Sequence, residues 1–137
     1  MNLLIDIDVD DMDKGVKFYT QALGLQVGRV MEKGGTVELV GGSSRIYLLK
    51  NEEGSSPSKA TSQKRTYKRH WTPVHFDVEV ENIHGAVARA VKAGATIDKD
   101  IEKFPYGFLA VMADPFGHGF CFVQPTGRWY DEIADKL

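Results

Sequence analysis

A histidine and two carboxylates stand at alternate positions in one short stretch of this chain. The stretch begins with His75, and Asp77 and Glu79 follow at two-residue spacing. Successive side chains of a β-strand point to opposite faces, so a strand here would place all three on one face. There His75 could act as a general base, a lone metal ligand or a hydrogen-bond donor to a ligand. It could also do no more than bond a neighbour such as Asp77 or Cys121.

A second pair of acids, Asp6 and Asp8, has the same spacing near the N-terminus. If both acidic faces line a cleft, that cleft suits a cationic or amine-bearing ligand, or carboxylate acid–base chemistry. In the alternative, the far ends of the strands lie at a solvated rim, where acids need no functional reason. That alternative applies most to Asp8 and Glu79, while Asp6 and Asp77 stand nearer the middle of their strands.

The acids recur because the chain contains an internal repeat. The segment LIDIDVDDMDKGVKFYTQALG, residues 4–24, matches HFDVEVENIHGAVARAVKAGA, residues 75–95, so that Leu4 falls on His75 and Asp6 on Asp77. One residue is lost inside the match, which places Gly24 on Gly94. An internal repeat constrains the architecture before any single residue is interpreted.

Each copy of the repeat predicts a strand, a helix and three further strands. Alternation, turn residues and glycine pairs place the strands at residues 3–9, 25–31, 36–40, 45–50, 74–80, 95–103, 108–113 and 120–124. The first helix is expected to begin after Asp10 or Asp11 and to end at Gly24, and the second to run from the Glu81-Asn82 cap to Gly94. Their apolar stripes are Met12, Val16, Tyr19 and Leu23, and Ile83, Val87, Ala90 and Val91.

The predicted fold is therefore α+β, with two tandem βαβββ modules in a single domain of residues 1–137. Its expected parts are module one at 1–50, a linker loop at 51–70, module two at 71–125 and a C-terminal tail at 126–137. The loop carries Lys59, Lys64, Arg65, Lys68 and Arg69 without an acid among them. We interpret it as a solvated or mobile connection, with an anion-binding or lid loop as the alternative. The tail could form a short amphipathic helix with Trp129 and Ile133 packed inward.

Composition excludes several classes of protein. The 137 residues carry 17 basic and 19 acidic side chains, a net charge of −2, so no global field attracts nucleic acid or a membrane. A nucleic-acid or partner-binding module that uses the loop from Lys59 to Arg69 ranks last among the hypotheses. No apolar run approaches a membrane span and the start lacks a signal peptide, so we expect a cytoplasmic protein. Cys121 is the only cysteine, which excludes an internal disulfide.

Two further groups of residues have both a functional and a structural interpretation. Cys121 stands among Phe120, Phe122 and Val123, where a packed, inert thiol is the favoured interpretation. Tyr106 belongs to an aromatic cluster that could line an apolar pocket or fill the core. The cluster is Phe104, Pro105, Tyr106 and Phe108.

Two βαβββ units, with FYTQALGL after the first strand and DPFGHGFCF before the last, resemble the glyoxalase/bleomycin-resistance/dioxygenase superfamily, the vicinal oxygen chelate fold. The resemblance implies a cupped mixed sheet with helices on its convex side and the cleft on its concave side. It places metal ligands of metal-dependent members at the positions of Leu4, Tyr47, His75 and Cys121. Leucine cannot ligate and tyrosine is an uncommon ligand, so only His75 and Cys121 offer suitable chemistry.

Together these observations favour a small-molecule-binding protein that is metal-independent, with an acid-lined cleft and no cofactor. Its ligand would be cationic or aromatic, and its candidate ligand-binding residues are Asp6, Tyr47, His75, Asp77, Tyr106 and Cys121. The alternative is a glyoxalase-like lyase or isomerase with a divalent metal or an acid–base site around His75, the candidate catalytic residue. The resemblance also implies a homodimer. The sequence identifies no substrate.

Overall fold

The computed structural model of the chain describes residues 1–137 and contains the expected elements in the expected order. Module one comprises β1 (Leu4–Val9), α1 (Met12–Leu23), β2 (Gln26–Met31), a short 3-10 helix η1 (Glu32–Gly34), β3 (Thr36–Val40) and β4 (Arg45–Lys50). Module two comprises β5 (Asp77–Glu79), α2 (Ile83–Ala93), β6 (Thr96–Phe104), β7 (Gly107–Ala113), β8 (Gly119–Pro125) and the 3-10 helix η2 (Trp129–Glu132). No helix has the length and apolar character that a membrane crossing requires.

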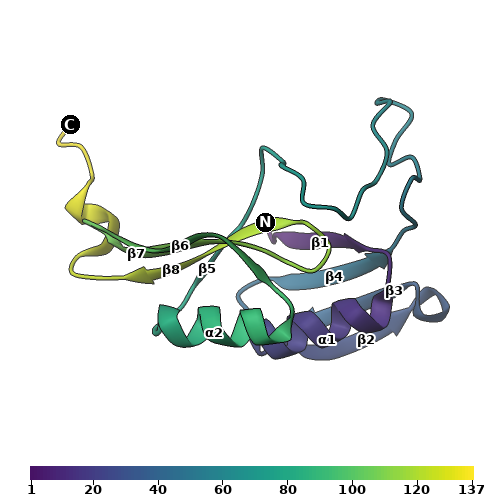
Figure 1. The fold of residues 1–137 in the computed structure, drawn as a ribbon, viewed down its shortest axis with the longest axis horizontal. Coiled ribbons are helices and arrows are strands. Elements are labelled where there is room, and N and C mark those ends of the chain that lie inside the picture. Colours follow the sequence, from purple (N-terminus) through teal and green to yellow (C-terminus); the bar gives the residue numbers. More distant parts are fainter.

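The strands form two four-stranded sheets with the same topology, β1-β4-β3-β2 and β5-β8-β7-β6. In each sheet the first strand pairs parallel with the last strand of its module, and the other neighbours are antiparallel. Both helices lie on the same side of the strands, while the segment that joins the modules arches over the opposite side (Figure 1). The predicted α+β fold of two βαβββ units is thus confirmed.

Strand alternation on β1 works as predicted. Ile7 and Val9 are buried in the core that the helices cover, while Asp6 on the other face is exposed. The parallel register places Asp6 opposite Tyr47 of β4. The sequence pattern therefore correctly separated the core face of this sheet from its polar face.

The helices begin and end where their capping residues indicate. Asp11 accepts a hydrogen bond from Lys14 N and Asn82 accepts one from Gly85 N, each at the first turn. Gly24 ends α1 with φ of 69°, a left-handed conformation that glycine adopts without steric cost. The prediction that Val91 belongs to the apolar stripe of α2 was wrong, because Val91 is 44% exposed. Ala86 is buried instead, since the packed face of α2 consists of positions 83, 86, 87 and 90.

The strand predicted at residues 74–80 is much shorter, because β5 contains only Asp77–Glu79. Just before it, Phe76 O still accepts from Cys121 N at 3.1 Å, and pairing of earlier residues would reach Gly119 at the start of β8. A β-carbon there would lie 2.9 Å from the Arg69 guanidinium, which packs against that glycine. Trp71 and Val74 lie before this strand and stand 80% and 81% exposed.

The C-terminal tail forms one 3-10 turn where an amphipathic helix was possible. Gly127 and Trp129 have φ of 57° and 59°, both in the left-handed region, and this interrupts a right-handed helical path. Trp129 is half-buried and packs edge-on against Tyr130, whereas Ile133 is exposed. The predicted inward packing of Ile133 was wrong.

The connecting segment is bonded to both modules, so its interpretation as a solvated connection was incomplete. Arg65 Nε lies 2.8 Å from Asp8 Oδ2, and the Tyr67 hydroxyl donates to Asn51 O. Arg69 donates to Gly117 O at 3.0 Å and pairs with Asp98 at 2.8 Å. The remaining basic residues, Lys59, Lys64 and Lys68, are exposed as expected.

A buried polar contact joins α1 to the turn before β8. The Tyr19 hydroxyl donates to Asp114 Oδ2, and Asp114 Oδ1 accepts from Phe116 N at 2.8 Å and His118 N at 2.9 Å. Asp114 is only 3% exposed, so its carboxylate depends on these donors in place of water. Burial, and then the neighbouring Asp114 charge, hold the pKa of Tyr19 well above its ordinary value.

Replacing Tyr19 by phenylalanine should destabilise the protein by about 1–3 kcal/mol, since it leaves a buried carboxylate oxygen without its donor. Urea unfolding followed by circular dichroism measures this loss. The matched control is Tyr130→Phe, because that tyrosine is exposed and should change the free energy of unfolding by less than about 0.5 kcal/mol. Equal stabilities for the two variants would contradict a structural role for the Tyr19–Asp114 bond.

Candidate functional site

A groove of about 1020 Å³ lies between β1 and the segment that connects the modules. We call it the ligand groove. Its walls come from β1, from the loop at 63–67, from the extended stretch at 70–76 and from the start of β8. Chain segments from both modules therefore contribute to it, and its size falls within the range of small-molecule sites.

One wall of the ligand groove is apolar and open to solvent. Leu3, Leu4, Trp71 and Val74 all line it, and all are among the large hydrophobic side chains that the protein leaves exposed. Scattered exposed hydrophobic residues are normal, but a group that lines one concavity indicates a binding surface. Leu3 precedes β1, and Trp71 and Val74 precede β5, so all three lie outside the sheets.

The acids of the ligand groove are not equivalent. Asp8 pairs with Arg65 at 2.8 Å and accepts from Asn51 Nδ2 at 2.9 Å, so its charge is already compensated. Asp6 is exposed and takes part in no ion pair. Asp77 and Glu79 lie outside the groove lining. The four acids predicted to share a cleft are thus divided, and Asp6 alone faces the groove with its charge uncompensated.

Two histidines connect the groove to both modules. His118 Nε2 lies 2.7 Å from Asp8 O, and His118 Nδ1 lies 2.9 Å from His70 Nε2. His70 Nδ1 in turn lies 2.8 Å from Lys68 O. The sequence analysis did not identify His118 as a site residue, because its place between Gly117 and Gly119 is typical of a turn. The flanking glycines were the available signal, since they let the connecting segment approach closely.

His75 belongs both to the ligand groove and to a second cluster on the sheet of module two. Its Nε2 lies 3.3 Å from Asp77 Oδ1, and the donor atoms of His75, Asp77 and Cys121 all lie within 4.8 Å of one another. The parallel register sets Asp77 directly beside Cys121. His75 and Asp77 are exposed, whereas Cys121 is buried.

The electrostatics of this cluster disfavour a thiolate. Burial, followed by the nearby Asp77 carboxylate, raises the pKa of Cys121 to about 11. Tyr106 is close enough to be affected as well, since burial and then Tyr130, Asp77 and Cys121 raise its pKa. Tyr106 also stacks on Phe104 with ring centroids 5.5 Å apart. Cys121 and Tyr106, both candidates from the sequence, therefore lie close to Asp77, and both are protonated at neutral pH.

Tyr47 is placed apart from these groups. Its hydroxyl donates to Glu38 Oε2 at 2.8 Å, and Arg29 binds the same carboxylate at 2.6 and 3.0 Å. The hydrogen bonds from Arg29 and Tyr47 lower the pKa of Glu38 to about 2. Sequence reasoning missed Glu38, although a lone acid in the apolar strand TVELV was a signal. The candidate residues thus fall into three groups. Asp6 and His75 line the ligand groove, Asp77, Cys121 and Tyr106 belong to the cluster of module two, and Tyr47 belongs to this polar network.

The donors available to a metal are those of module two. His75, Asp77 and Cys121 are ligand types that zinc accepts, and they come together from β5, the residues just before it, and β8. Leu4 has no donor atom, and the Tyr47 hydroxyl is bonded to Glu38. The four-position ligand set that the resemblance implied therefore does not assemble in this chain.

The sequence and the fold match known proteins over most of the chain. A family model described as a glyoxalase-like domain matches residues 4–123. An uncharacterised protein of Mycobacterium bovis is 30% identical over 123 residues, which cover 86% of this chain and 79% of the relative.

Solved structures share the fold at low identity. TnmS3, an antibiotic-binding protein from Streptomyces sp. CB03234, superposes with a TM-score of 0.64 at 16% identity, covering 92% of this chain and 96% of that one. A glyoxalase/bleomycin resistance protein/dioxygenase family enzyme from Burkholderia phytofirmans gives 0.65 at 21% identity, covering 90% and 97%. With the family model matched over residues 4–123, the chain belongs to the glyoxalase-like domain family.

Proposed function

We propose that this protein binds a small aromatic cation in the ligand groove without the help of a metal ion. The observation that carries the proposal is the groove itself, which is lined by exposed Trp71, Leu4 and Val74 and also by Asp6, whose carboxylate forms no ion pair. An indole face attracts a cation, and a carboxylate supplies the opposite charge. The existence of an antibiotic-binding protein with the same fold supports a binding role.

In this proposal the polar groups of the groove orient the ligand. His75 stands at the groove edge with its ring 3.3 Å from Asp77, which limits its rotation and makes it a directed hydrogen-bonding partner. Tyr47, Tyr106 and Cys121 lie outside the groove lining and do not contact the ligand in this proposal. Homodimerisation and a cytoplasmic location remain predictions of the sequence analysis.

The binding proposal is tested with acridine orange, a planar aromatic cation, and fluorescein, a planar aromatic anion. In a Trp129→Phe background Trp71 is the only tryptophan, and we expect the cation to quench its fluorescence saturably while the anion does not. Asp6→Asn should weaken cation binding about twofold to fivefold, the value of a solvated charge pair. Trp71→Ala should weaken cation binding about tenfold, and calorimetry measures this because the variant lacks the fluorescent side chain.

The control for Asp6→Asn is Asp135→Asn, which removes the same charge from the exposed tail. It should leave the affinity unchanged. Equal binding of the cation and the anion, or equal losses in the two asparagine variants, would contradict an aromatic-cation site at Asp6.

A lyase or isomerase with a divalent metal is the second candidate, favoured by the convergence of His75, Asp77 and Cys121 within 4.8 Å. A metal bound there would act as a Lewis acid on a carbonyl oxygen. His75 and Asp77 would supply the exposed ligands, and Cys121 would have to lose its proton. The pKa of about 11 opposes that loss, and module one adds no donor, so we rank this function below metal-free binding.

Metal analysis separates the two functions. We expect untagged protein, purified without chelator and incubated with zinc, nickel, iron or manganese, to retain less than about one tenth of an equivalent by elemental analysis, since the protonated thiol of Cys121 leaves only His75 and Asp77 ready to ligate. His75→Ala is compared with His84→Ala, which changes an exposed histidine of α2. A stoichiometric metal that His75→Ala removes and His84→Ala retains would establish the metal-dependent function instead.

The protonation of Cys121 is a separate prediction. With a pKa of about 11, the carbon-13 shift of its Cβ should stay constant between about pH 6 and pH 9, where an ordinary thiol begins to titrate. Asp77→Asn should lower that pKa only in part, because burial is the larger cause. Asp100→Asn, in exposed β6, should leave it unchanged. A complete titration below pH 9 in the unaltered protein would show a reactive thiol.

A further inference from the structure

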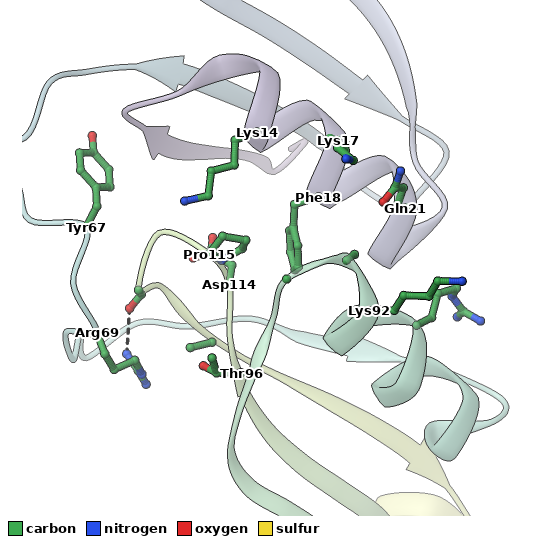
Figure 2. Close-up of a pocket in the computed structure, with 15 residues that line it drawn as sticks. Lys14, Lys17, Phe18, Gln21, Tyr67, Arg69, Lys92, Thr96, Asp114 and Pro115 are labelled. Atoms are coloured by element: carbon green, nitrogen blue, oxygen red, sulfur yellow. Dashed lines mark hydrogen bonds between the residues drawn. The ribbon is translucent and has the colours of Figure 1, made fainter.

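A second cavity, of about 970 Å³, lies on the side of the molecule that the helices occupy. We call it the helix-side cavity. It is bounded by α1, by the end of α2 and by the turn from Asp114 to Gly117, and it shares only Tyr67 with the ligand groove. Figure 2 shows its lining, with Phe18 and Pro115 between the charged side chains.

The helix-side cavity is strongly basic. Five of its lining residues are cationic, and they come from three separate segments: Lys14 and Lys17 of α1, Arg89 and Lys92 of α2, and Arg69 of the connecting segment. Such a concentration is local, because the whole chain has a net charge of −2. Clefts lined by one sign of charge focus the field and raise the local concentration of oppositely charged ligands.

No free carboxylate balances these cations within the lining. Asp114 is the single acid there, and both of its oxygens already accept hydrogen bonds from Tyr19, Phe116 N and His118 N. Arg69 is paired with Asp98. The other four cations form no ion pair, so their charges remain available to an anion from solution.

The distribution of the cations indicates the shape of the anion. In Figure 2, Lys14, Tyr67 and Arg69 stand on one side of the cavity, and Lys17, Gln21 and Lys92 stand on the other. Between the two sides lie Pro115, which is partly exposed, and Phe18, which is 1% exposed and forms the floor. A single inorganic ion would satisfy one side only. A small molecule with several phosphate groups and an apolar body would contact the cations of both sides and the apolar middle.

We propose that the helix-side cavity binds an organic polyphosphate of nucleotide size. This site is independent of the proposed function of the ligand groove, since it uses other residues and the opposite charge. Lysine supplies point charges and arginine supplies paired donors, and both suit phosphate oxygens. The exposed positions of all four unpaired cations keep the site accessible.

The test is calorimetric titration with ADP and with inorganic tripolyphosphate, at low salt and again at physiological salt. We expect both probes to bind, ADP more tightly, with affinities that fall as salt rises. The double variant Arg89→Gln and Lys92→Gln should weaken binding at least tenfold. Its matched control, Lys59→Gln with Lys136→Gln, removes two exposed charges outside the cavity and should change affinity less than twofold.

The urea unfolding midpoints of both double variants are measured alongside. Glutamine at these exposed positions should leave the midpoints unchanged. If the cavity variant proves unstable, Lys17→Gln with Lys14→Gln replaces it. The proposal is overturned if neither ADP nor tripolyphosphate binds. It is also overturned if the cavity variant and the control variant lose the same affinity. Binding of a single-stranded oligonucleotide without binding of ADP also overturns it. None of these outcomes depends on whether the ligand groove binds an aromatic cation.

Discussion

The buried hydrogen bond between Tyr19 and Asp114 is the contact on which the arrangement of the two modules depends. It joins residues separated by 95 positions, one on the first helix and one in the turn before the last strand. Asp114 holds that turn closed through Phe116 N and His118 N. A buried carboxylate that lost these donors would carry a large desolvation penalty, so the turn and the helix stabilise each other.

The same turn fixes the connecting segment. A β-carbon at Gly117 would lie 2.1 Å from Lys68 O, so only glycine permits this approach, and its φ of 80° adds a second requirement for glycine. The approach brings His70 to His118 and His118 to Asp8 O. The ligand groove on one side and the helix-side cavity on the other are therefore both shaped by the turn from Asp114 to Gly117.

The sequence was sufficient for the elements whose periodicity and caps are local. The strands at 36–40 and 45–50 have the predicted bounds, and Asp11 and Asn82 cap the helices as expected. The residues that define the groove could not be predicted, because they depend on distant contacts. Arg65 compensates Asp8 across 57 positions, and Arg69 packs against Gly119.

The internal repeat also explains why the functional residues are not symmetric. His75 and Cys121 of module two correspond to Leu4 and Tyr47 of module one, and the two sheets use these positions differently. In module one, Glu38 binds both Arg29 and Tyr47, and this network occupies the face beside Asp6. In module two, Asp77 stands between an exposed imidazole and a buried thiol, where it contacts the first and adds to the burial that raises the pKa of the second. One carboxylate thus lies beside an exposed imidazole and a buried thiol, and the more exposed of the two, His75, is the one that reaches the groove.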